Sequence, residues 1–480
     1  MFWIEYHLWG LHPFGYHLLN VLLHSVNAIL LWTILRKLEV RGAWLAAGIF
    51  ALHPVCVESV AWVTEGKNVL SGVFYFTSIL TAMRFWLPDC DQTNASGLKA
   101  QPNADFFRGD FKFYWLAFTF YLCAVCSKTA TLPLPAVVLL LVWWKRGGLK
   151  WRDILLTTPF VAIGMGMGII TIYVERHLGT AAGQWNLSFL GRCLVAGKDF
   201  WFYLGKLVWP NPLIFVYPRW KIDLSQASAC LPVAAIIIVF CLSWFRRNSW
   251  GRPVLVALVY FLALLFLVLG FFNVFYFQYS YVSDHFQYLA CVGPIALIAA
   301  GFTELTNRFI KGHVLLKAIP AGILLSGLSV LTWHQCGMYH DIETLWRTTI
   351  VQNPNAFMAH DNLGSLLARK GRTDEAIGHF QSALRVEPDD IIAHNNLGSA
   401  LLQENDPDDA MVHFKKAIEI EPNDAVAYSG LGGVLLMKGD IDGAIQKLDE
   451  SLRLNPNLSA AQKNLDLALK IKERHASQSN

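Results

Sequence analysis

The chain has 480 residues, of which 54% are hydrophobic and only 15% charged, and its mean hydropathy is +0.39. Soluble domains carry roughly 25% charged residues, so this composition excludes an ordinary soluble protein. The net charge of +4 is too small to indicate nucleic-acid binding. The nine cysteines are scattered, so we expect no disulfide scaffold, and Cys123 and Cys126 form a C-x-x-C inside an apolar run that favours a packing role over a redox or metal site.

The first two thirds of the chain is a string of apolar runs, each of roughly the length that crosses a bilayer core. We predict about ten transmembrane helices, near 18–36, 43–62, 68–86, 113–127, 131–145, 153–174, 230–245, 253–271, 287–306 and 313–333. The segment 189–208 contains four charged residues, so we interpret it as an amphipathic helix on the outer surface.

Basic residues cluster in alternate loops between these runs, and the positive-inside rule places such loops in the cytoplasm. The clusters are Arg36, Lys37 and Arg41; Lys145, Arg146, Lys150 and Arg152; Arg246, Arg247 and Arg252; and Arg308 with Lys311. The C-terminal part then lies outside. The same topology puts Met1 outside without a preceding span, which suggests that an upstream transmembrane helix is missing.

The C-terminal part repeats with a period of 34 residues, which is the period of tetratricopeptide (TPR) repeats. Small residues and prolines recur one period apart: Gly364, Gly398 and Gly432; Ala376, Ala410 and Ala444; and Pro388, Pro422 and Pro456. We expect a transmembrane domain over 1–336, a half repeat or linker helix over 341–356, three repeats over 357–390, 391–424 and 425–458, and a cap helix with a polar tail over 459–480. The fold class is therefore all-α, a helical membrane bundle followed by an α-solenoid. Such an array predicts binding of a peptide or protein, without saying which.

Ionisable residues inside apolar spans are costly and are candidates for function. His17, Asn20, His24 and Asn27 follow one another at spacings of three, four and three, so they share one helix face. Hydrogen bonding between helices and the lining of a functional cavity explain this stripe equally well.

Three further groups lie at the ends of predicted spans, and all fall on the outer side in the predicted topology. They are His53, Glu58, Glu65 and Lys67 around the helix-breaking Pro54; Ser127 and Lys128; and Asp284, His285 and Tyr288 after an aromatic run. Acids there could deprotonate an acceptor hydroxyl, and Lys and His could hold a phosphate. Each residue taken alone is more often structural, but their convergence predicts a functional cavity. The chain has no G-x-x-x-x-G-K-[ST], H-E-x-x-H or G-x-S-x-G motif, and we assign no metal.

Five runs of the membrane part are distinctive in combination: YHLLNVLLHSVNAILLW (16–32), ALHPVCVESVAWVTEGKNVLSG (51–72), CSKTATLPLPAVVLLL (126–141), YLGKLVWPNPLIFVYP (203–218) and VSDHFQYLACVGP (282–294). Followed by TPRs, they resemble the TMTC-type protein O-mannosyltransferases and related bacterial TPR-bearing membrane proteins. It implies a GT-C fold and transfer of a sugar, typically mannose, from a polyprenyl-phosphate carrier to Ser or Thr of a protein held by the TPRs. No other cofactor is implied.

Carried onto this chain, the resemblance implies that the donor phosphate and sugar site is lined by Glu58, Lys67, Lys128, Asp284 and His285. Together with the polar groups described above, we expect Glu58 and Asp284 to be catalytic. We expect the donor phosphate and sugar to be held by Lys67, Lys128, His285, His53, His24, Asn20 and His17. The membrane would be a bacterial inner membrane with periplasmic TPRs, or the endoplasmic reticulum with lumenal TPRs. The chain departs from the family at its start, where the first transmembrane helix and the acidic outer loop are absent and only Glu5 remains.

Two rival interpretations follow. One is a non-catalytic, membrane-anchored TPR scaffold, which the absent acidic loop favours. The other is an envelope polysaccharide ligase or polymerase, which the short late loop 272–286 disfavours because it lacks Lys and Arg.

Overall fold

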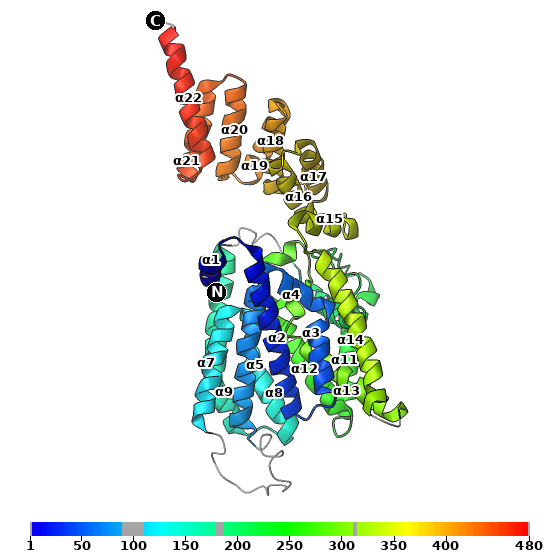
Figure 1. The fold of residues 1–480 in the computed structure, drawn as a ribbon. Helices are drawn as coiled ribbons and strands as arrows, with labels where there is room; N and C mark the ends of the chain where they lie inside the picture. The colour runs from blue at the N-terminus through cyan, green and yellow to red at the C-terminus, as the bar shows by residue number, and fades with distance from the viewer. Residues whose placement is uncertain (1, 89–109, 179–186, 224, 311–313, 479–480) are drawn as a thin grey trace. The chain divides into compact units, whose positions relative to one another are not determined.

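A computed structural model describes residues 2–88, 110–178, 187–223, 225–310 and 314–478 (Figure 1). These residues form helices and loops and contain no strand, which confirms the all-α prediction. They divide into two compact units. The first comprises residues 1–215 and 219–339, and the second comprises 216–218 and 340–480.

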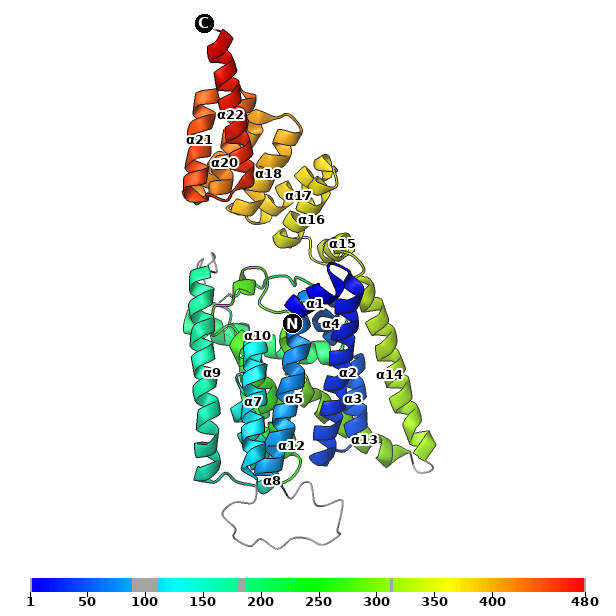
Figure 2. The ribbon, with the colours of Figure 1, turned by 60° about the vertical axis from the view of Figure 1, so that its left-hand side comes forward.

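The first unit is a bundle of mostly parallel and antiparallel helices (Figure 2). Its helices are α1 (Phe2–Trp9), α2 (Pro13–Lys37), α3 (Ala43–Leu52), α4 (Val57–Ala61), α5 (Gly66–Trp86), α7 (Phe111–Ser127), α8 (Leu134–Arg146), α9 (Trp151–Leu178), α10 (Phe189–Val208), α11 (Leu231–Phe245), α12 (Gly251–Leu265), α13 (Val292–Phe309) and α14 (Val314–Gly337). Short 3-10 turns link several of them, including η1 (Pro54–Cys56), η2 (Val63–Glu65), η3 (Thr129–Thr131) and η7 (Asp284–Gln287).

All ten predicted spans fall on helices, but not every helix is long and apolar enough to cross a membrane. Among the described residues, six helices meet that standard by length and composition, and a seventh is counted if α3 and the η1–α4 segment form one bent span. The predicted span 43–62 is interrupted at Pro54 and bends by 54°, because proline has no N–H to continue the helix. The chain is an integral membrane protein, and the number of ten spans stays a prediction.

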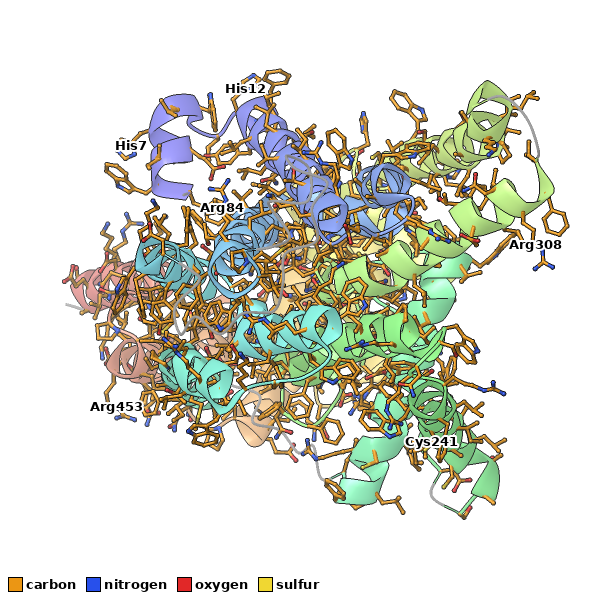
Figure 3. The ribbon with its side chains drawn as sticks, turned by 90° about the horizontal axis from the view of Figure 1, so that it is seen from below. His7, His12, Arg84, Cys241, Arg308 and Arg453 are labelled. Carbon is orange, nitrogen blue, oxygen red and sulfur yellow. The ribbon has the colours of Figure 1, made fainter. Side chains whose placement is uncertain are left out.

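The bundle has a packed interior and an apolar exterior. Phe50, Phe76 and Phe160 are buried, whereas Ile237 on α11 and Ile323 on α14 are exposed. Lipid rather than water suits such an exterior, since soluble monomers rarely expose large apolar patches. Seen from below, Cys241 on α11 and Arg308 near the end of α13 lie at the rim of the bundle (Figure 3).

The predicted amphipathic segment forms one helix, α10, with the predicted bounds. One side of it is buried in the bundle, including Phe200 and Tyr203, while Phe189 and Val208 at its two ends are exposed. Its location on the outer surface stays a prediction.

The second unit consists of α15 (Ile342–Gln352) followed by three helix pairs and a long last helix. The pairs are α16 (Phe357–Arg369) with α17 (Thr373–Val386), α18 (Ile391–Gln403) with α19 (Pro407–Ile420), and α20 (Ala425–Met437) with α21 (Ile441–Leu454); the last helix is α22 (Ser459–Gln478).

The repeated small residues explain how each pair packs. A Cβ added to Gly364 would lie 2.6 Å from the Phe380 ring, and one added to Gly398 would lie 2.9 Å from the Phe414 ring. Real Cβ atoms do not approach so closely, so only glycine lets these rings pack against the first helix of the pair. The period seen in the sequence is therefore a packing requirement.

Candidate functional site

The site begins where α3 ends. His53 is buried, accepts a hydrogen bond from the Val55 amide at Nδ1 (3.3 Å), and contacts the Leu207 carbonyl at Nε2 (3.1 Å). Both ring nitrogens are therefore engaged with backbone, and the ring holds the chain break against the end of α10. This arrangement makes His53 a structural residue at the edge of the site.

Glu58, on the short helix after the break, is only 2% exposed. Its carboxylate accepts the His285 amide N–H (2.9 Å) and the Ser283 hydroxyl (3.1 Å), and it contacts His285 Nδ1 (2.9 Å). Asn68 on α5 donates to the His285 carbonyl (2.9 Å) and to Ser59 Oγ (2.9 Å). A buried charge needs such partners, and here they bind the segment 283–285 to α4 and α5.

These contacts assign the tautomer of His285. Because an ionised carboxylate only accepts hydrogen bonds, a proton on Nδ1 satisfies the 2.9 Å contact with Glu58. In that tautomer the lone pair of the ring is on Nε2. Trp62, Tyr276 and Phe286 surround the ring, with centroid distances of 5.7, 6.0 and 4.5 Å. The carboxylate thus orients a histidine that can accept a proton.

A second charged group centres on Glu65, which is 3% exposed. Its Oε2 accepts a hydrogen bond from Lys128 Nζ (2.7 Å), and its Oε1 pairs with Lys67 Nζ at 3.1 Å. Lys128 is mostly buried, whereas the Lys67 side chain is 48% exposed. Two cations share one carboxylate, so the group carries net positive charge and suits an anion. It interacts electrostatically with the first group, through Glu65 with His285 and Lys128 with Glu58.

Asp284 lies on the same short segment as His285 and is also buried. It interacts electrostatically with Lys206 and Tyr203 of α10 and with Tyr276. Tyr203 also accepts a hydrogen bond from the Ser283 amide (3.1 Å). The segment 283–285 therefore joins α10 to the break between α3 and α5, and places two carboxylates beside one histidine.

The polar stripe of α2 makes a different set of contacts. Asn20 donates to the Val60 carbonyl (3.1 Å), His24 contacts the Tyr288 hydroxyl (2.9 Å) and the Ala51 carbonyl (3.3 Å), and Asn27 donates to the Val69 carbonyl (2.8 Å). His17 is half-buried at the start of the stripe. These bonds fasten α2 to its neighbours, which favours the structural interpretation of Asn20, His24 and Asn27.

The structure brings together Glu58, Lys67, Lys128, Asp284 and His285. Asn20 and His53 contact backbone groups, whereas His24 and Asn27 contact both backbone carbonyls and the Tyr288 hydroxyl. The structure also adds Ser283 and Asn68, which are absent from the predicted groups, and it gives Glu65, a member of a predicted group without an assigned role, the place between the two lysines. Glu65 stands in the same helix-end group as Lys67, so its charge was a usable signal. Among the described residues, no three His, Cys, Asp or Glu side chains converge as metal ligands would.

Family models for the tetratricopeptide repeat match residues 343–391, 362–425 and 401–465. The chain is 26% identical over 446 residues to human protein O-mannosyl-transferase TMTC4, an alignment that covers 79% of this chain and 56% of that protein. Human TMTC1 is 22% identical, with coverages of 79% and 46%. The Caenorhabditis elegans protein O-mannosyl-transferase F38B6.6 is 23% identical, with coverages of 81% and 53%.

The chain is similar to the TMTC-type protein O-mannosyl-transferases over most of its length. It spans about half the length of the curated relatives it matches. The alignments cover about four fifths of this chain, which is more than its repeats alone, so the likeness extends into the helical bundle.

Proposed function

We propose that this protein is a membrane glycosyltransferase. It moves a sugar, mannose by analogy with the relatives' names, from a polyprenyl-phosphate carrier to Ser or Thr hydroxyls of proteins on the outer or lumenal side. The observation that carries the proposal is the pair of buried charged groups, Glu58–Ser283–His285 beside Glu65–Lys67–Lys128, at the ends of apolar helices. Burying charged side chains inside a membrane bundle is energetically costly, so such groups are candidates for function.

The two groups divide the chemistry between them. Lys67 and Lys128 together carry one more positive charge than Glu65 neutralises, so in this proposal they hold the donor phosphate and stabilise its charge as the bond from the sugar C1 to the phosphate oxygen breaks. The acceptor oxygen forms the new bond to C1. Its proton passes to His285 Nε2 or to Asp284, and polyprenyl phosphate leaves with the bonding electrons. Glu58 acts through His285 as a positioning residue.

We place the repeats on the acceptor side of the reaction. In this proposal the TPR unit binds the acceptor protein in the periplasm of a bacterium or in the lumen of the endoplasmic reticulum. Recognition and chemistry then belong to separate units of the chain.

The test is transfer of labelled mannose from polyprenyl-phosphate mannose to protein by membranes that contain this chain. We expect transfer by the unmodified chain, loss of transfer in Lys128→Met, and no change in Lys150→Met, which removes the same charge from an exposed loop. Absence of transfer by the unmodified chain would contradict the proposal that this protein is a glycosyltransferase. Equal transfer by both variants would contradict the proposed role of Lys128 in the site.

A scaffold remains the second candidate. It is favoured by one observation: Glu58 and Glu65 both find all their partners within the chain, which a purely structural role also explains. Under this alternative, membranes show no transfer while the TPR unit still captures a partner protein.

A further inference from the structure

An apolar pocket lies between α2, α5, α8, α12 and α13, in the half of the bundle away from the candidate site. Together with its opening it comprises about 720 Å³ of free space, and pockets that hold small ligands comprise about 300–1,000 Å³. From α2 it is lined by residues near the end of the helix, such as Leu35 and Leu38. From α5 it is lined by Phe76 and Ile79 rather than by the start of the helix, where Lys67 lies. The pocket is therefore separate from the charged groups described above.

The wall of the pocket is apolar. Leu31, Phe76 and Val292 line it and are buried in the bundle. Tyr260 supplies a hydroxyl to the wall, but this group donates to the Leu289 carbonyl (3.2 Å). A space without polar partners does not hold ordered water. In a membrane-spanning bundle, the material that can fill such a space is the hydrocarbon of the bilayer.

The pocket opens beside the basic loops. Of its lining residues, Pro253 is exposed, and Val40 and Ala300 are partly exposed. Arg252 directly precedes Pro253 at the start of α12. The opening therefore lies where α2 and α8 end and α12 begins, and these helix ends carry the basic residues that predict the cytoplasmic side.

Two cations are fixed at this opening by contacts with the end of α8. Lys145 Nζ lies 5.4 Å from the centre of the Trp144 ring, which lines the pocket, and 3.5 Å from the exposed carboxylate of Glu39. Arg252 donates to the Trp143 carbonyl (2.7 Å), and its Cζ lies 5.1 Å from the centre of the Trp143 ring. Among the described residues no carboxylate forms an ion pair with Arg252. The opening therefore keeps a positive charge that a phosphate can neutralise.

We propose that this pocket binds one hydrocarbon chain of an anionic phospholipid from the leaflet beside the basic loops. The chain fills the apolar space, and the lipid phosphate lies at Arg252 and Lys145. Basic pockets between transmembrane helices suit anionic headgroups, whereas a zwitterionic lipid would bury the same chain without this net attraction. Binding of this lipid requires no sugar transfer, so it does not depend on the proposed function.

The experiment counts bound lipid by native mass spectrometry. The full chain is purified in detergent, freed of lipid, and titrated with phosphatidylglycerol, phosphatidylcholine or polyprenyl phosphate. We expect a single phosphatidylglycerol to bind about tenfold more tightly than phosphatidylcholine, as one or two basic residues at a headgroup allow. Polyprenyl phosphate at an equal concentration should not displace it.

Two pairs of variants locate the lipid. Ala296→Phe places a ring in the pocket and should abolish binding without lowering the melting midpoint of the lipid-free protein, whereas Ile298→Phe, at an exposed position of the same helix, should leave binding unchanged. Arg252→Gln should abolish the preference for phosphatidylglycerol, and Arg247→Gln, at an exposed position of the same loop, should leave it unchanged.

Four results would overturn the proposal: no bound phosphatidylglycerol, equal binding of the two phospholipids, binding that survives Ala296→Phe, or a preference that survives Arg252→Gln. Displacement of phosphatidylglycerol by an equal concentration of polyprenyl phosphate would overturn it as well, because the pocket would then hold the tail of the sugar donor.

Discussion

At the scale of single residues, Glu58 and Glu65 show how surroundings decide the role of a buried carboxylate. Glu58 accepts from a backbone amide, a serine and a histidine, so it fixes the position of a short segment. Glu65 sits between two lysines and leaves them with one excess positive charge. The same chemical group therefore orients a proton acceptor in one place and tunes an anion site in the other.

Glu58→Gln tests the orienting role. The amide keeps one acceptor oxygen but presents N–H to the segment, so the His285 ring loses the partner that holds a proton on Nδ1. We expect transfer to fall about a hundredfold or more, measured as initial rates of labelled mannose incorporation. The control is Glu304→Gln, which removes an exposed carboxylate paired with Arg41 and should have no effect. Similar rates for both variants would contradict the orienting role.

Glu65→Gln tests whether the Glu65 carboxylate stabilises the two lysines of the proposed anion site. Removing the carboxylate leaves Lys67 and Lys128 without their shared partner and raises the local positive charge. Since a buried pair broken on one side costs about 3–5 kcal/mol, we expect a lower thermal midpoint of the bundle. The double variant Glu65→Gln with Lys128→Met removes both charges and should recover part of that loss in the same melting measurement. No recovery would show that the two residues act independently.

Sequence reasoning at this scale found the ionisable residues because charge in an apolar run is conspicuous. It did not find Ser283 or Asn68, which are neutral and common in loops. It also did not foresee that His53, His24 and Asn20 contact backbone carbonyls, since nothing local in their spans distinguishes a hydrogen-bonded structural residue from a ligand.

At the scale of elements, the site is built from helix ends rather than helix middles. The short helix α4, the turn η2, the start of α5, the end of α7 and the turn η7 supply its charged residues. Backbone groups at helix ends lack partners within the helix, so they bond to side chains such as His53 and Glu58. The interruption at Pro54 is thus a condition for placing Glu58 in the interior.

Gly72→Ala tests the packing of α2 on α5. A Cβ at residue 72 would lie 2.7 Å from Asn27 Nδ2 and displace its hydrogen bonds to the Val69 carbonyl and the Tyr288 hydroxyl. We expect a loss of about 1–3 kcal/mol, seen as a lower melting midpoint in detergent. Gly166→Ala on α9, where no atom lies within 4 Å of the added Cβ, is the matched control. A midpoint unchanged in both would contradict the close packing.

Elements were predictable to the extent that hydrophobic length determines them. The helices, the TPR period and α10 follow from apolar runs, spacing and charge. The positions of the helix ends could not be predicted from the sequence. The α-helix in the predicted span 253–271 ends at Leu265, and the helix in the predicted span 287–306 begins at Val292. The aromatic residues 271–281 are not helical over their length: they form a loop with a short 3-10 turn at Phe275–Gln278, in which Tyr276 packs against His285.

At the scale of the whole molecule, the two units are stabilised in different ways. The bundle depends on lipid and buried polar contacts, whereas the repeats depend on neighbour-to-neighbour packing. In each of the first two repeats, a pair of histidines meets with Nδ1 atoms 3.0 Å apart: His360 with His379, and His394 with His413. The third repeat has Lys447 over the ring of Tyr428 at the matching positions.

The histidine pairs predict a pH dependence. Burial lowers the pKa of His360 and, with repulsion from His360, that of His379. Their contribution to stability is therefore complete above the unfolded value of 6.5 and is lost as the pH falls below it. Asp361 acts in the opposite sense, because its raised pKa of about 6 makes the folded state gain stability as the pH falls through that value.

Replacing His360 with Tyr and His379 with Lys copies the pair of the third repeat and should remove the histidine contribution. When the pH is lowered from 7.5 to 5.5, the melting midpoint of the TPR unit should drop in both proteins. We expect the drop to be about 2–4 °C smaller in the variant than in the unmodified protein. The measurement is circular dichroism of the full chain in detergent at each pH. Identical pH profiles of the variant and the unmodified protein would contradict the role of the His360–His379 pair in the pH dependence.

The distance in sequence between Glu58 and its partners has a consequence for synthesis. Ser283 is 225 residues further along the chain, so a ribosome that adds roughly 5–20 residues per second needs roughly 10–45 s to supply it. Throughout that interval the carboxylate of Glu58 has neither Ser283 nor His285. The segment after Pro54 therefore completes its hydrogen bonds only after Ser283 and His285 have been made, so the site closes late in the assembly of the chain.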